Sequence, residues 1–456
     1  MNQRTHLASQ AELARFLDAY PDIQAVQIMI TDPSGVLRGK SVRREELQRI
    51  FETGRQVAGS ILGLDITGED VDATGLVWDT GDADMTARPI AGSLKVTPWL
   101  AAPTAQLMLT MFDGAGAPAA ADPRHALARM VERFAALGMT PVVACEIEFY
   151  LLKEESGGRL APAGGGRAGE RHKIDAYSLT RLDDLAPLFD DVYRAAAAQG
   201  LPAETLMSEY APGQFEITLH HRDDALLAVD EAVMFKRLLR GVAAKHGLIA
   251  CFMAKPFADR AGSGLHVHVS LNDAQGRNLF ASEEPAGTPG LRHAIGGMKS
   301  TMAESMAIFA PNANSYRRFV SESYAPTAPI WGINNRTVSL RVPAGPAASR
   351  HVEHRIAGAD ANLYLAVAAV LAAAELGMRA RLDPGPPIEG NGYAQAGERT
   401  LPRTWYEALE RAEQSKFLRD ALGKEFLDVF LAIKRQECER FSSQVTELDF
   451  AWYLRS

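Results

Sequence analysis

Short segments in which polar and apolar residues alternate, and which carry acidic side chains and histidines, constrain the fold of this chain most strongly. They read Glu146-Ile147-Glu148, Leu265-His266-Val267-His268 and His351-Val352-Glu353-His354-Arg355. Residues two apart on a β-strand point to the same face of a sheet. Each segment is therefore expected to present two polar side chains together: Glu146 with Glu148, His266 with His268, and Glu353 with Arg355.

Two further glutamates, Glu209 and Glu216, flank an expected turn at Ala211-Pro212-Gly213. Carboxylates that converge without cations repel one another strongly, so a site shared by all these strands needs divalent metal. Oxygen-rich ligation with a single imidazole favours Mg²⁺ or Mn²⁺ over zinc. The alternative reading of any one strand alone is the polar face of a sheet edge.

The composition is that of an ordinary globular protein. At 456 residues, with 47% hydrophobic and 23% charged residues, the chain can form two or three domains. The net charge of −8 and the absence of a basic run argue against nucleic-acid binding. Cys145, Cys251 and Cys438 lack metal-binding spacing and are expected to be free thiols.

The chain carries no expected membrane or export signal. Its N-terminal segment reads as a polar amphipathic helix, and no stretch approaches ~18 apolar residues. We therefore expect a cytoplasmic protein without a membrane partner.

The order of the expected elements indicates an α+β fold. Strands are expected across residues 23–113, including one at 61–66, and a helix begins at Asp122-Pro123. We place a domain boundary near residue 115. Beyond it, strands alternate irregularly with helices expected near 182–199, 223–246, 293–309, 360–380 and 416–443.

Six longer motifs follow one another along the chain. They are CEIEFYLL (145–152), EYAPGQFEI (209–217), FMAKPFADRAGSGLHVHVSL (252–271), NSYRRF (314–319), NNRTVSLRVP (334–343) and HVEHR (351–355). In this order they resemble the glutamine synthetase superfamily, and the resemblance extends from the early RGK turn to VTELDFAWYL at the C-terminus.

The resemblance implies an architecture and an assembly. It implies an N-terminal β-grasp-like domain over residues 1–115 and a glutamine synthetase-type catalytic domain over residues 116–456. The curved antiparallel sheet of the catalytic domain would form a funnel, with nucleotide at one end and amino acid at the other. It also implies a homo-oligomer, a dodecamer of two hexameric rings, with active sites between neighbouring subunits.

The resemblance further implies the chemistry. A γ-carboxylate acylates an amine after ATP has converted it to γ-glutamyl phosphate, and this phosphoryl transfer uses metal ions and arginines rather than a protein nucleophile. The implied metal ligands form two sets: Glu148, Glu209 and Glu216 for one ion, and Glu146, His266 and Glu353 for the ion that bridges the ATP phosphates.

Other positions match substrate contacts of the family. Glu204, His268 and Ser270 match nucleotide contacts. Arg336 and Arg341 match catalytic arginines around the transferred phosphate, Arg336 on the substrate side and Arg341 on the nucleotide side. Arg318, Arg355 and Gly262 match the glutamate site, where a guanidinium fork suits a carboxylate. The alternative is that such arginines merely solvate a surface.

Two departures from the family pattern concern the acceptor. The segment VAGSILGLD (57–65) keeps the substrate-contacting Ser60 but lacks the aspartate that binds ammonium in glutamine synthetases. Tyr324 stands where those enzymes carry a catalytic flap glutamate. A tyrosine, with a pKa near ~10, is not an anionic ligand at neutral pH, but it offers an aromatic face to an alkyl chain or a cationic amine.

We therefore expect a ligase that joins glutamate to an organic amine, and a polyamine such as putrescine is the leading acceptor. One alternative is a glutamine synthetase that uses ammonium, in which Glu322 takes the place of the flap glutamate. The other is a noncatalytic homologue with a regulatory or scaffold role. Erosion of the metal ligands would mark that homologue, whereas all six are present here.

Overall fold

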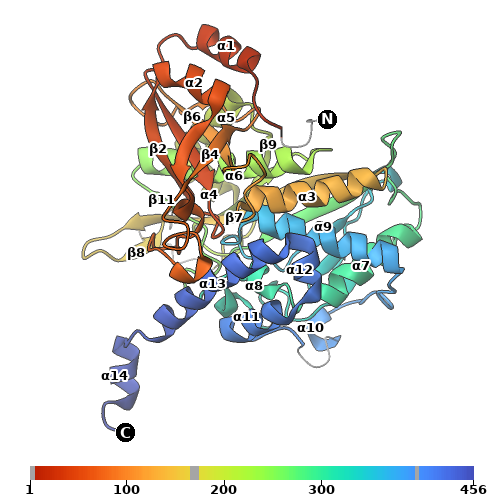
Figure 1. Cartoon of the computed structure of the whole chain (residues 1–456). Coiled ribbons are helices and arrows are strands. Elements are labelled where there is room, and N and C mark those ends of the chain that lie inside the picture. Colours follow the sequence, from red (N-terminus) through yellow and green to blue (C-terminus); the bar gives the residue numbers. More distant parts are fainter. Residues whose placement is uncertain (1–5, 165–173, 396–399) are drawn as a thin grey trace.

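The computed structural model describes residues 6–164, 174–395 and 400–456, which form two β-sheets flanked by helices (Figure 1). The first sheet comprises β1 (Ala25–Thr31), β2 (Leu37–Arg43), β3 (Arg55–Ala58), β4 (Asp84–Pro89), β5 (Lys95–Val96) and β6 (Thr104–Phe112). Its strand order is β2-β1-β6-β4-β3, with β5 paired to β6. Helices α1 (Gln10–Ala19) and α2 (Leu47–Thr53) accompany it. Strand β1 pairs parallel with β6 and antiparallel with β2, which agrees with the expected β-grasp-like fold.

The strand expected at residues 61–66 is wrong. Residues Gly59–Leu62 form a 3₁₀ helix, and the strand of this region is β3, which ends at Ala58. The buried Asp65 side chain accepts hydrogen bonds from the backbone N–H groups of Thr67 and Glu69. Such side-chain-to-backbone bonds favour a turn over a strand, so residues 61–66 do not form the strand that their apolar pattern predicts.

The second sheet carries the polar motifs of the sequence. Its strands are β7 (Thr140–Glu154), β8 (Leu160–Pro162), β9 (Ala203–Ser208), β10 (Gln214–Leu219), β11 (Ile249–Cys251), β12 (Leu265–Asn272), β13 (Trp331–Ile333), β14 (Leu340–Val342) and β15 (Val352–His354). Their order is β13-β14-β15-β12-β7-β10-β9, with β8 and β11 also paired to β7. All pairs are antiparallel except β13 with β14.

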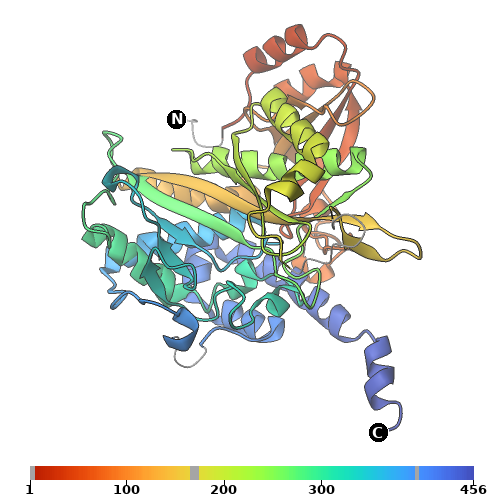
Figure 2. The same ribbon diagram turned by 180° about the vertical axis from the view of Figure 1, so that it is seen from behind.

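Helices cover one face of this sheet (Figure 2). The helices between residues 123 and 301 are α3 (Pro123–Ala136), α4 (Leu179–Asp184), α5 (Ala186–Gln199), α6 (Ala225–Lys245) and α7 (Pro289–Thr301). Those that follow are α8 (Met306–Phe309), α9 (Leu363–Ala380), α10 (Gly392–Gln395), α11 (Trp405–Gln414), α12 (Lys416–Leu422), α13 (Lys424–Ser442) and α14 (Glu447–Tyr453). On β7, Cys145, Ile147 and Phe149 are buried in the core that these helices share. Because side chains alternate along a strand, Glu146 and Glu148 point to the opposite face.

Several helices differ from what the sequence pattern predicts. The helix expected at 416–443 is divided at Gly423 (φ 84°) into α12 and α13, and the one expected at 182–199 is divided at Leu185 between α4 and α5. The single helix expected at 293–309 is interrupted between α7 and α8, where the hydroxyls of Thr301 and Ser305 bond to backbone carbonyls four residues earlier. Helix α9 has the length and composition to cross a membrane, contrary to the expectation from sequence, but 78% of that stretch is buried inside the protein. Because α9 is apolar on all sides, it packs at the centre of the hydrophobic core.

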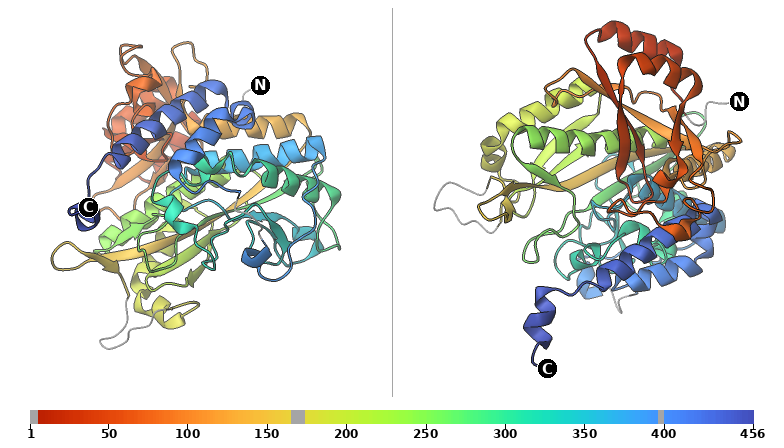
Figure 3. Two further views of the ribbon diagram at one scale, coloured as in Figure 1. Left: turned by 90° about the horizontal axis from the view of Figure 1, so that it is seen from below. Right: turned by 60° about the vertical axis from the view of Figure 1, so that its left-hand side comes forward.

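The C-terminal helices connect the two parts of the molecule. In α13, Val429 and Ile433 belong to the core of the N-terminal sheet. Lys434 donates to the Ser34 hydroxyl (2.9 Å) in the β1–β2 turn, and α13 lies beside the N-terminal 3₁₀ turn Asp72–Thr74 (Figure 3). Helix α14 instead projects from the body of the molecule (Figure 1), and its apolar side chains, which include Phe450 and Trp452, are exposed.

Candidate metal and nucleotide site

The register of the second sheet brings the predicted ligand residues together. Across β7 and β10, Glu148 is paired with Glu216, and across β7 and β12, Glu146 is paired with His266. Strand β15 continues the pattern, because Glu353 is paired with His268 of β12. Directly opposite residues in an antiparallel pair have Cβ atoms about 5 Å apart, so four strands place these side chains on one patch of the sheet.

His266 lies at the centre of this patch. Its Nδ1 is 2.7 Å from Glu146 Oε1 and 3.6 Å from Glu353 Oε1, and its Nε2 is 3.7 Å from Glu148 Oε1. Two groups of potential ligand atoms each lie within 4.8 Å of one another: Glu146, His266 and Glu353, and separately Glu148, Glu216 and His266. The first group matches one expected ligand set, and the second contains two members of the other set.

Glu209 follows β9 and is the fifth carboxylate of this cluster, beside Glu146, Glu148, Glu216 and Glu353. Burial and the charges of Glu148 and Glu146 raise its pKa to about 7. Burial and the same neighbours raise the pKa of Glu216 to about 12. Burial opposes ionisation of Glu146 too, but hydrogen bonds from His266 and His268 lower its pKa well below the ordinary value. The five carboxylates cannot all ionise together without cations, so the donor set fits divalent metal.

A cavity of about 1080 Å³ opens beside the cluster. Glu146 lines it, and so do all four residues predicted to contact nucleotide, Glu204, His268, Ser270 and Arg341. This volume suits a nucleotide-sized ligand.

Three histidines that the sequence analysis did not assign also line this cavity. His220 lies 2.7 Å from Glu204 and packs against His221, with the ring centroids 4.3 Å apart. His351 lies 3.0 Å from His268. His220 and His221 could have been proposed from the sequence, because they follow directly after the strand that ends at Leu219.

The four predicted arginines differ in their environments. Arg318 is 4% exposed and donates to the backbone carbonyls of Ile356 (2.9 Å) and Arg355 (3.3 Å). Arg341 and Arg355 both pair with Glu353, and the buried Nε atoms of both have no hydrogen-bond partner among the described residues. Arg336 is exposed, and its charge opposes the rise in the pKa of Glu209.

Gly262 occupies a position where a side chain would not fit. A Cβ atom there would lie 2.6 Å from the Ala254 carbonyl oxygen and 2.8 Å from Arg318 Cγ. The carbonyl of Gly262 accepts from Gln214 Nε2 (3.0 Å), and the N–H of the neighbouring Gly264 donates to Glu148 Oε2 (2.6 Å). The glycine-rich loop thus lies against both Arg318 and the carboxylate cluster.

Two predicted residues lie apart from the cluster. Tyr324 is 56% exposed on the loop after Arg318 and has a left-handed backbone (φ 57°), as does Glu322 (φ 61°). Ser60 lies in the 3₁₀ helix of the N-terminal part, where its N–H donates to Asp82 Oδ1 (3.3 Å). No described residue of the carboxylate cluster forms a hydrogen bond or ion pair with either of them.

Comparison with known proteins agrees with this geometry. Residues 120–453 match the family model of the glutamine synthetase catalytic domain. The chain is 39% identical to gamma-glutamylputrescine synthetase of Escherichia coli, covering 100% of this chain and 96% of that protein. It is 33% identical to glutamate–isopropylamine ligase of a Pseudomonas species, covering 95% of each. The solved structure of a GmaS/ADP complex superposes with a TM-score of 0.85 at 28% identity, covering 97% of this chain and 99% of that one.

Proposed function

The chain belongs to the glutamine synthetase family, and on that premise we propose that it joins the γ-carboxylate of glutamate to an organic amine at the expense of ATP. The observation that carries the proposal is the pair of ligand groups that share His266, beside a nucleotide-sized cavity that Glu146 lines. Similar proteins named for glutamate–amine ligation span nearly the whole chain, which supports the same reaction here.

The carboxylate cluster would hold two divalent ions, Mg²⁺ or Mn²⁺. Glu146, His266 and Glu353 would hold one, and Glu148, Glu209 and Glu216 the other. Such ions, when bound, neutralise phosphate oxygens and so favour phosphoryl transfer. The residues of the chain position those ions: the hydrogen bond from Gly264 N–H orients Glu148, and Arg341 orients Glu353.

The arginines would hold the anionic parts of the substrates. Arg318 is buried without a carboxylate partner among the described residues, so the α-carboxylate of glutamate would satisfy it. Arg355 would bind the other carboxylate beside the Gly262 backbone. Arg336 and Arg341 would stabilise the phosphoryl group during transfer, because Arg341 pairs with Glu353 and the charge of Arg336 acts on Glu209.

The acceptor would be an alkyl amine, with putrescine the leading candidate. Neither Tyr324 nor the segment around Ser60 supplies the carboxylate that would hold ammonium and remove its proton. The exposed ring of Tyr324 instead offers an apolar wall to a methylene chain. Ser60 would act in the site of a neighbouring subunit, since it lies apart from the cluster of its own chain.

We propose a cytoplasmic homo-oligomer, a dodecamer of two hexameric rings. The exposed apolar side chains of α14 support association, because a helix that projects with Phe450 and Trp452 uncovered gains stability by docking on another subunit. Deleting residues 444–456 and measuring the mass by light scattering tests this assignment. An unchanged mass would refute the role of α14.

Phosphate release with a panel of amines tests the function. In the presence of glutamate, ATP and Mg²⁺, putrescine should support turnover, whereas ammonium should be at least tenfold less efficient in kcat/KM. Matched controls are 1-aminobutane, which lacks the distal ammonium, and 1,4-butanediol, which lacks both. Ammonium as the best acceptor would identify a glutamine synthetase. No release with any amine would favour the noncatalytic alternative.

A further inference from the structure

A second cavity, of about 830 Å³, lies where the N-terminal sheet meets α6, and none of its lining residues belongs to the site described above. The N-terminal part contributes Gln27, the β1–β2 turn at 34–37, Ile66, Trp99 and Leu100. The catalytic part contributes residues of α6, Phe252, Met253, Asn312, Asn314, Asp360 and Ala361. The cavity is large enough for a small metabolite.

Helix α6 places three cations on this cavity, Lys236, Arg237 and Arg240, and the one acidic residue that lines it is Asp360. Arg237 is satisfied, because it donates to the side-chain oxygens of Gln106 and Gln27. Asp360 accepts from Asn312 (2.8 Å) and does not form an ion pair with any described cation. The cavity therefore has a net positive lining.

Lys236 and Arg240 form no ion pair with any described residue, although the charge of Asp360 acts on Lys236 and partly offsets the fall in its pKa. Lys236 Nζ donates to the backbone carbonyl of Ala359 (2.8 Å) and lies 4.8 Å from the centre of the Phe252 ring. The Arg240 guanidinium lies 4.9 Å from the same ring centre. Like charges four residues apart on a helix repel, and burial together with Arg240 lowers the pKa of Lys236 to about 7.

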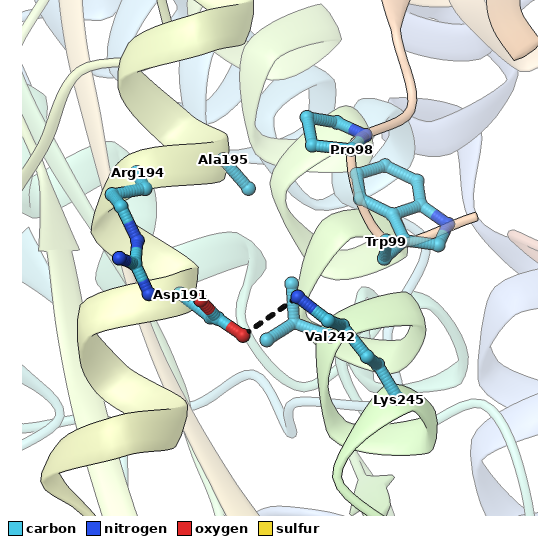
Figure 4. A pocket seen from close by; sticks show the side chains of 7 residues that line it. All are labelled: Pro98, Trp99, Asp191, Arg194, Ala195, Val242 and Lys245. Atoms are coloured by element: carbon cyan, nitrogen blue, oxygen red, sulfur yellow. Dashed lines mark hydrogen bonds and ion pairs between the residues drawn. The ribbon is translucent and has the colours of Figure 1, made fainter. Parts of the chain in front are cut away.

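A neighbouring cavity provides the contrast. It has a volume of about 390 Å³, shares Trp99, and is shown in Figure 4. There Asp191 accepts from Lys245 (2.9 Å) and pairs with Arg194, so its cations are already neutralised. Lys236 and Arg240 have no equivalent of Asp191, and an anion from outside the chain would take its place.

We propose that the cavity between α6 and the N-terminal sheet binds a small organic dianion. Its carboxylate or phosphate oxygens would lie between Lys236 and Arg240, and its carbon skeleton would pack against Trp99 and Leu100. Asn312 and Asn314 also line the cavity, but their side-chain amides already bond to Asp360 and to the Lys255 backbone, so the polar contacts of the ligand would come from Lys236 and Arg240. This site is separate from the proposed ligase site, so its binding is measured without turnover.

Calorimetric titration of the full-length protein tests the proposal with two dianions, succinate and ribose 5-phosphate, which separate a carboxylate from a phosphate ligand. Succinamide and ribose are their neutral controls. Arg240→Gln and Lys236→Met should each weaken dianion binding at least tenfold. Lys245→Met, in the neighbouring cavity, and Arg341→Gln, in the nucleotide cavity, should leave it unchanged.

A second measurement does not depend on the stability of those variants. Binding to the unmodified protein should change tryptophan fluorescence, and Trp99→Phe should abolish most of that change while the calorimetric affinity persists within about threefold. The proposal is overturned if neither dianion binds, if Arg240→Gln and Lys236→Met bind as tightly as the unmodified protein, or if Arg341→Gln abolishes binding.

Discussion

Replacing Glu216 by glutamine tests the electrostatics of the carboxylate cluster without changing its shape. Glu216 is 3% exposed, and burial with the surrounding glutamates raises its pKa from 4.5 to about 12. Metal-free protein therefore takes up a proton at Glu216 when it folds above pH 4.5. The contribution of Glu216 to stability is greatest below that pH and falls as the pH rises, by about 1.4 kcal/mol per pH unit.

At pH 7 the loss of stability from Glu216 reaches about 3 kcal/mol. Because folded Glu216 is still protonated at pH 7, the size of this loss is set by the pH and not by the raised pKa. Glutamine is a neutral isostere of the protonated side chain and avoids the cost. Metal-free Glu216→Gln should therefore be more stable than the unmodified protein at pH 7 by about 3 kcal/mol at most. The two proteins should become similar near pH 5.

Urea unfolding in EDTA at pH 5 and pH 7 measures this difference, with Glu154→Gln at the exposed end of β7 as the matched control. Adding Mg²⁺ should reverse the order at pH 7, because the unmodified protein then gains binding energy that the variant has largely lost. A variant less stable than the unmodified protein at pH 7 in EDTA, or equal stabilisation of both by Mg²⁺, would refute the reasoning.

Three other changes probe the cluster, the acceptor site and the core. Glu148→Ala should slow phosphate release on the order of 10³-fold, whereas Glu154→Ala should stay within about twofold; a loss below tenfold would remove Glu148 from the ligand set. Tyr324→Glu should raise the kcat/KM ratio of ammonium to putrescine, and an unchanged ratio would place Tyr324 outside the acceptor pocket. Arg124→Met should lower the unfolding free energy by about 3–5 kcal/mol in urea titrations, because it leaves the buried Asp230 carboxylate without its cation; a loss below about 1 kcal/mol would contradict this.

The placement of polar side chains on one face of each strand could be predicted, because it depends on local alternation. Glu146 and Glu148 share a face of β7 whatever strand lies beside them. The register could not be predicted in the same way: the pairing of Glu148 with Glu216, rather than with a residue two positions away, depends on the β9–β10 hairpin and on packing beneath the sheet. His266 therefore emerged as a member of both ligand groups from the structure alone.

Other features depend on contacts between distant segments. Whether Lys236 and Arg240 are neutralised depends on which side chains the N-terminal sheet brings to α6, and a helical pattern of apolar residues carries no such information. The strand expected at 61–66 was wrong for a similar reason, since Asp65 bonds to the backbone of its own turn and to Arg440 of α13. The predicted role of Ser60 depends on a contact between chains, because its predicted partner belongs to another subunit.

The contribution of α13 to the first core affects the order in which the protein can fold during synthesis. The N-terminal strands leave the ribosome first, but Val429 and Ile433 complete their core only after nearly the whole chain has emerged. Lys434, which bonds to the β1–β2 turn, arrives equally late. Part of the apolar surface of the N-terminal sheet therefore stays uncovered until α13 is made, and exposed apolar surface of this kind makes a partly folded chain prone to aggregation.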